Sequence, residues 1–305
     1  ELVDALWPDS KVTQTSVHTE RYKSFIEYVC AELSSVRLDE EDFVIRDLNG
    51  VRTIIQELHS VRGKARKRIL EHLQTSYLNS SDDSVMRSIE LTLRLCLTMN
   101  IRSPDVTTQP ARSNTSNIEW EDESTLDELI RAQFPRTEYP LKSSKEYRID
   151  AKFTAPFLSN IAGIQIDWTD DLAEHLQYNH HRRALKVYQH KICLIHHLES
   201  GDSIIPSDIL TEAIDTLNLL FPFDGRDTKS FLRKNKKDFY KLGHHGRIRL
   251  LDLRKYSYWR HQLCDLIEVS NEPAYGWRQL LKDSRNKVEY WTFWIALVVF
   301  SLTVI

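Results

Sequence analysis

The last 15 residues of the chain, 291–305, constrain its fold most strongly, because they contain no charged residue and form its most apolar run. A helix needs about 20 apolar residues to cross a bilayer, and this run is still apolar at its last residue. Tyr290, Trp291 and Trp294 resemble the aromatic belt of a membrane interface. The sequence therefore predicts that residues 286–305 are the start of a transmembrane helix.

The side chains predicted to lie in the membrane are Trp291, Trp294, Ile295, Leu297, Val298, Val299, Phe300 and Leu302. Just before the run, between residues 278 and 289, basic residues outnumber acidic ones, which favours the cytoplasmic side. We therefore expect a membrane protein whose soluble body faces the cytoplasm and whose C-terminal segment contacts the lipid bilayer. The alternative is a buried apolar C-terminal helix.

The rest of the chain contains few helix-breaking residues, with 8 Gly and 9 Pro in 305 residues. Apolar residues recur at helical spacing in several segments, for example at Tyr22, Phe25 and Val29. Residues 183–199 show the same spacing and are predicted to be helical. The alternating segment 163–168 resembles a strand but is too short to predict a sheet.

These patterns predict an all-α fold, a multi-helix bundle body in two halves whose C-terminal helix continues into the apolar transmembrane segment. Residues 101–118 are rich in Ser, Thr, Pro and Asn, which is typical of a linker. We predict an N-terminal helical bundle at 1–100, a polar linker with one short helix at 101–150, a C-terminal helical domain at 151–285 and the start of the transmembrane helix at 286–305.

Two polar motifs predict where helices begin. Thr125 and Glu128 have the spacing of a capping box, in which each side chain bonds the backbone N–H of the other residue. Ser81 precedes a segment that is apolar on most faces. We expect Ser81 to cap this segment and the helix that follows to form the centre of the N-terminal bundle.

The composition gives no sign of a nucleic-acid partner, because the formal net charge is −3. The four cysteines, Cys30, Cys96, Cys193 and Cys264, are far apart and lack CxxC spacing. We interpret them as buried reduced thiols, with a disulfide framework or a cysteine metal site as the alternative. The basic cluster at 62–68 favours a solvated helix face over a patch for nucleic acid or anionic lipid.

Half of the 12 histidines lie between residues 175 and 197. They are His175, His180, His181, His190, His196 and His197. A dense group of histidines suggests a metal site, but there is no HExxH motif and no i, i+4 pair with a carboxylate in register. We therefore predict helix-surface and buried, hydrogen-bonded histidines, and no metal site or cofactor.

The fingerprints of P-loop, Rossmann and hydrolase chemistry are absent from the sequence, so it predicts no catalytic residue. Asn79 and Asn114 match the N-glycosylation pattern. We interpret both as chance matches and expect them to be unmodified, because the body is expected to face the cytoplasm.

Several segments resemble a large group of uncharacterised fungal proteins. They are IQIDWTDDL at 164–172, HL at 175–176, LLFP at 219–222, YWR at 258–260, DSRN at 283–286 and WTFW at 291–294. In that group a helical body is followed by a C-terminal hydrophobic hairpin. The resemblance covers roughly the second half of the chain, and it implies a membrane protein of filamentous fungi with no established activity.

The chain is also similar, more weakly, to CorA-like divalent-cation channels, which place an α-rich cytosolic domain before a membrane helix. The Gly-Met-Asn motif of those channels does not occur in this sequence. The leading hypothesis is a membrane-anchored cytosolic helical domain that interacts with other proteins. The alternatives are the cytosolic domain of a CorA-like channel and an enzyme on an all-α scaffold.

Overall fold

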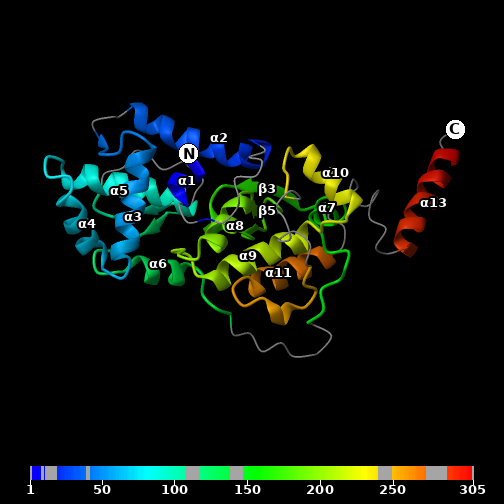
Figure 1. Ribbon diagram of the computed structural model, residues 1–305. Helices are drawn as coiled ribbons and strands as arrows, with labels where there is room; N and C mark the ends of the chain where they lie inside the picture. Colours follow the sequence, from blue (N-terminus) through cyan, green and yellow to red (C-terminus); the bar gives the residue numbers. More distant parts are fainter. Residues whose placement is uncertain are drawn as a thin grey trace.

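The computed structural model describes residues 2–7, 10, 19–38, 42–106, 117–137, 147–239, 249–272 and 287–303. A group of helices lies beside a small sheet that is surrounded by further helices (Figure 1). The helices are α1 (Leu2–Leu6), α2 (Thr19–Leu38), α3 (Leu48–Val61), α4 (Arg66–Gln74), α5 (Asp82–Leu97), α6 (Leu126–Gln133), α7 (Ala155–Asn160), α8 (Lys191–Ser200), α9 (Ser207–Leu220), α10 (Arg226–Lys234), α11 (Arg260–Asn271) and α13 (Lys287–Thr303).

The predicted all-α fold is wrong, because the described chain forms two sheets and is mixed α and β. The larger sheet has the order β3-β5-β4, and the smaller one pairs β1 with β2 in parallel. In the larger sheet β3 runs parallel to β5, and β4 runs antiparallel to β5. The strands are β1 (Ile101–Arg102), β2 (Ile118–Glu119), β3 (Gln165–Thr169), β4 (Tyr178–Asn179) and β5 (Ala184–Tyr188).

The error lies mainly in residues 183–199, which divide into β5 and α8 rather than forming one helix. Leu185 and Tyr188 are three residues apart, as on one helix face, but both belong to the central strand of the sheet. Ala184 and Val187 are buried as well, so the strand lacks the alternation that marks a half-exposed strand.

The predicted helix starts are confirmed. Ser81 accepts a hydrogen bond from the Ser84 N–H at the start of α5. Thr125 and Glu128 form the complete capping box of α6. Thr98, in the left-handed conformation with φ 51°, ends α5, which is buried along most of its length.

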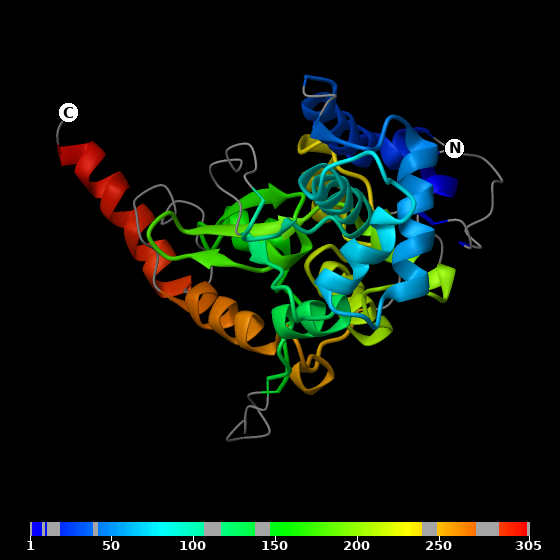
Figure 2. The ribbon, with the colours of Figure 1, turned by 90° about the vertical axis from the view of Figure 1, so that its left-hand side faces the viewer.

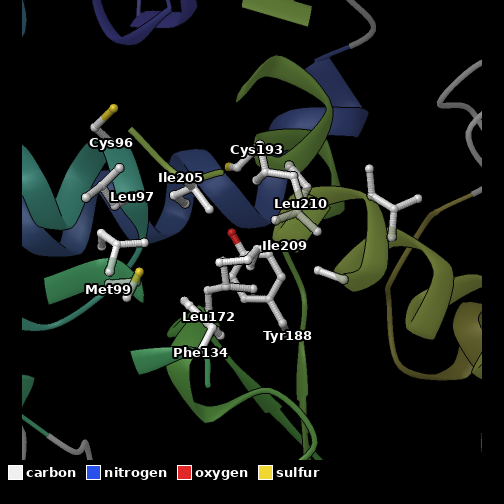
Figure 3. Close-up of a cluster of buried hydrophobic side chains, with 14 of the residues drawn as sticks. Cys96, Leu97, Met99, Phe134, Leu172, Tyr188, Cys193, Ile205, Ile209 and Leu210 are labelled. Carbon is white, nitrogen blue, oxygen red and sulfur yellow. The ribbon is translucent and has the colours of Figure 1, made fainter. Parts of the chain in front are cut away.

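One cluster of buried apolar side chains includes residues of both predicted halves. In Figure 3, Leu97 and Met99 lie near Leu172, Tyr188 and Ile209. The predicted domain boundaries stay predictions, and most of the predicted linker at 101–118 lies outside the described residues.

The predicted transmembrane segment is wrong for the described chain. Residues 287–303 form the 17-residue helix α13, which starts with Lys287 and has Glu289 in its first turn. No helix in the described ranges combines the length and apolarity that a membrane crossing requires. The predicted membrane localisation, with the body facing the cytoplasm, depended on this segment and is wrong with it.

Helix α13 lies at one end of the molecule (Figure 1), and both views show it apart from the sheet (Figure 2). Most of the side chains that were predicted to lie in the membrane are exposed, while Trp294 is half-buried and the side chain of Leu297 lies outside the described part. The exposed ones are Trp291, Ile295, Val298, Val299, Phe300 and Leu302. The basic residues at 278, 282 and 285, used to predict orientation, also lie outside the described residues.

Candidate functional site

Strand β3 is an edge strand of the larger sheet, and no described strand pairs with its outer edge. The Gln165 N–H donates to the Arg183 carbonyl at 2.8 Å, and the Gln189 N–H donates to the Thr169 carbonyl at 3.1 Å. In a parallel ladder alternate residues bond the same neighbour, so the backbones of Gln165, Asp167 and Thr169 face β5. The backbone groups of Ile166 and Trp168 therefore point outward, and no described residue bonds them.

A pocket of about 600 Å³ lies beside the first half of this edge. Its walls come from the end of α7, the turn into β3 and one face of α10, all shown in Figure 1. The pocket is mostly polar, with Ile164, Ile166 and Phe231 as its apolar residues. Its polar lining includes Ser159, Asn160, Asp227, Ser230 and Lys234.

A sharp turn between α7 and β3 sets the near wall of this pocket. The Thr154 side chain caps α7 by accepting a hydrogen bond from the Phe157 N–H, and Pro156 occupies the first turn. Gly163 then adopts φ 68°, a conformation that other residues rarely tolerate. The Ile164 N–H donates back to the Leu158 carbonyl at 2.9 Å, so the turn fixes where β3 starts.

The far wall, α10, is held to β3 at the Trp168 end. The Trp168 Nε1–H donates to Asn235 Oδ1 at 3.4 Å, and the Trp168 ring stacks on Phe221 with a centroid distance of 5.6 Å. Asn235 in turn donates to the Phe231 carbonyl at 2.8 Å. These contacts hold the C-terminal end of α10 against β3.

The predicted histidine cluster is divided among buried structural contacts. The His175 Nδ1 accepts from the Tyr188 N–H at 3.2 Å, so its Nε2–H donates to the Thr216 hydroxyl at 2.7 Å. Burial lowers the pKa of His175 to about 3. The His197 Nε2–H donates to the Cys96 carbonyl at 2.8 Å.

His196 stacks on Trp7 with a centroid distance of 5.0 Å and bonds the Tyr22 hydroxyl at 2.9 Å. His180 and His181 are exposed. Within the described residues, no group of three or more His, Cys, Asp or Glu side chains could hold a metal ion. The buried histidines therefore hold β5, α8 and the N-terminal helices together through hydrogen bonds and ring contacts.

The His197→Gln substitution is expected to reduce the loss of folding stability that occurs as the pH falls below 6.5. Burial lowers the pKa of His197 to about 4, and an unfolded histidine titrates near 6.5. Below pH 6.5 the unfolded chain binds a proton at this ring and the folded chain does not, so stability falls by about 1.4 kcal/mol per pH unit until about pH 4. Glutamine can still donate to the Cys96 carbonyl but does not titrate.

The free energy of unfolding at pH 7 and pH 5 tests this effect. Between these values the decrease should be about 2 kcal/mol smaller in the variant than in the parent chain, because 1.5 pH units lie below 6.5. An equal decrease in both proteins would show that His197 does not stay neutral in the folded state.

The cysteines and the basic cluster differ partly from expectation. Cys96 and Cys193 are buried, but Cys30 is exposed, and all four are free thiols. In the basic cluster Arg66 is buried and bonds Asp105 at 2.8 Å, and it also bonds Asp122. This arginine therefore connects α4 to the loops around β1 and β2 rather than facing solvent.

No family model, curated protein or solved structure matches this chain. The resemblances to the fungal group and to CorA-like channels therefore stay expectations. Strand β3 was visible in the sequence as the alternation of Ile164, Ile166 and Trp168 after Gly163, but its position at the edge of a sheet was not. The sequence also predicts a basic helix from about Thr228 to Leu242, and the structure has α10 there. What sequence reasoning missed is that this helix, about 60 residues further along the chain, forms the opposite wall of the pocket.

Proposed function

We propose that this chain is a protein-interaction module that binds an extended segment of a partner protein by adding it as a strand to β3. The observation that carries the proposal is the outward-facing backbone of Ile166 and Trp168 beside the pocket of about 600 Å³. Edge strands present N–H and C=O groups that an incoming strand can pair with. Strand addition of this kind is a recurrent mode of peptide recognition.

The pocket also suggests which peptide would fit. In an added strand, backbone bonds supply affinity and alternate side chains enter the pocket. Ile166 and Phe231, which are both half-buried, offer an apolar surface for one of these side chains. Asp227 and Lys234 put opposite charges on the α10 wall, which favours a peptide of mixed polarity over a strongly charged one.

The Ile166→Pro substitution tests the proposal through the backbone. Proline removes the outward N–H of residue 166, and the bonds to β5 come from the neighbouring residues, so the sheet retains its own ladder. Peptides selected for binding from a library of short random sequences should bind this variant about tenfold more weakly, because one hydrogen bond is lost. Binding is measured by fluorescence anisotropy.

The control is Ile166→Val, which keeps the N–H and a similar shape and should bind as the parent does. Circular dichroism verifies that both variants are folded. Unchanged affinity in a folded Ile166→Pro variant, or a library that yields no binding peptide, would contradict strand addition. No contact in the described ranges favours the channel alternative.

A further inference from the structure

A second pocket, of about 320 Å³, lies between α2, the start of α8 and the chain that follows α10. Figure 1 shows the N-terminal end of α2 close to α10 and the sheet. The lining is strongly basic, with Lys23, Arg233, Lys236 and Lys237 around one acidic residue, Asp238. This charge balance differs from that of the chain as a whole, which has a formal net charge of −3.

Three of these cations have no anionic partner among the described residues. Neither Lys23, Arg233 nor Lys236 forms an ion pair with any residue that the structure describes. Lys237 differs, because its ammonium donates to Gln189 and lies 5.5 Å from the Trp168 ring centroid. Like charges that share a pocket repel one another, and a bound anion would offset this repulsion.

The backbone contributes a further positive field. Helix α8 starts at Lys191, and its N-cap residue His190 provides no side-chain cap. The first N–H groups of a helix have no partner inside the helix, and here Lys191 and Ile192 both line the pocket. Together with the helix dipole, such N–H groups form a common binding site for phosphate.

His190 is an independent sign that a polar ligand belongs here. Its side chain is 1% exposed, and its Nε2–H donates to Asp170 at 2.7 Å. The Nδ1 atom has no hydrogen-bond partner, although buried polar atoms rarely lack one. His190 lines the same pocket, where Nδ1 could bond a ligand hydroxyl or a P–OH group.

The backbone at Lys236 is strained. This residue has φ 55°, in the left-handed region that few non-glycine residues adopt. Strained residues of this kind gather at ligand-binding sites, where the strain holds a side chain in place. The Lys191 ammonium, in contrast, bonds Asn218 at 2.5 Å, so Lys191 contributes its backbone rather than its charge.

We infer that this pocket binds a phosphate group, either free or as part of a small phosphomonoester. Arg233 provides a planar fork that can bond two phosphate oxygens, and Lys23 and Lys236 supply point charges. The start of α8 provides the backbone N–H groups. The inference does not depend on peptide binding at β3.

Calorimetric titration with inorganic phosphate and with glycerol phosphate, at constant ionic strength, tests the site. Saturable binding of either is expected, and tighter binding of one identifies the source of the phosphate. The Arg233→Gln variant should weaken binding about tenfold, because a charge-assisted hydrogen bond is lost. The matched control is Arg226→Gln, which makes the same change at the other end of α10 and should leave affinity unchanged.

Two further measurements make the outcome decisive. Thermal unfolding without phosphate shows whether the variants are folded, and phosphate should raise the melting temperature of the parent more than that of Arg233→Gln. An absence of saturable binding at millimolar phosphate would overturn the inference. An equal loss in the Arg226→Gln control would also overturn it, because only general electrostatic attraction would then remain.

Discussion

The Glu212→Ala variant is expected to lose about 4 kcal/mol of stability, because three backbone N–H groups then lack their acceptor. The Glu212 carboxylate, on α9, accepts from Ser257 at 2.6 Å, from Tyr258 at 2.7 Å and from Trp259 at 2.8 Å. Glu212 is buried. It therefore joins α9 to the segment that leads into α11.

Burial raises the pKa of Glu212, and the three backbone N–H groups act in the opposite direction. In a variant without the carboxylate, buried N–H groups keep no acceptor, and an unbonded buried polar group is costly. Urea unfolding gives the free-energy difference. The control is Glu268→Ala, an exposed change on α11 that should stay within about 0.5 kcal/mol of the parent. Equal midpoints for Glu212→Ala and the parent would contradict this role.

The Arg249→Met variant is expected to lose about 3 kcal/mol, because one guanidinium bonds three carbonyl groups. Its Nε–H donates to Leu219 at 3.1 Å, and its two terminal nitrogens donate to Ala151 at 2.6 Å and Phe153 at 2.7 Å. These carbonyls belong to the end of α9 and to the segment just before α7. Methionine replaces the length of the side chain but none of these bonds.

The effect should extend to the pocket beside β3, since the segment at 151–153 leads into α7, which forms its near wall. Selected peptides should therefore bind Arg249→Met more weakly as well. Stability is measured by urea unfolding, with Arg254→Met as the control. Arg254 is exposed and pairs with the half-buried Asp252, and the loss of an ion pair at the surface should cost far less than the loss of the Arg249 bonds. Similar losses in the two variants would show that the three carbonyl bonds contribute little.

The sequence predicted local features of this fold well. The capping box at Thr125, the cap at Ser81 and the apolar stripe of α2 all depend on residues within one or two helical turns. Such patterns are visible in one sequence because the interacting groups are close along the chain.

The sheet and both pockets depend on distant residues and could not be predicted in the same way. Strand β5 is buried on both faces, so it carries no period of two. The alternation in β3 was visible, but its pairing with β5 depends on residues about 20 positions later. In the basic pocket, Lys23 and Arg233 are far apart along the chain. Neither belongs to the basic cluster at 62–68, which is the conspicuous one in the sequence.

The C-terminal run shows how apolarity alone can mislead. Its composition suggested a membrane span, but no helix in the described part of the chain is long and apolar enough to cross a membrane.

Amide hydrogen exchange at β3 tests the open edge most directly. In the free protein, the Ile166 and Trp168 amides should exchange roughly a hundredfold faster than the Asp167 amide, which bonds β5. When a selected peptide binds, Ile166 and Trp168 should become protected and Asp167 should change little. Protection of Ile166 and Trp168 in the free protein, or no gain of protection with bound peptide, would contradict strand addition at β3.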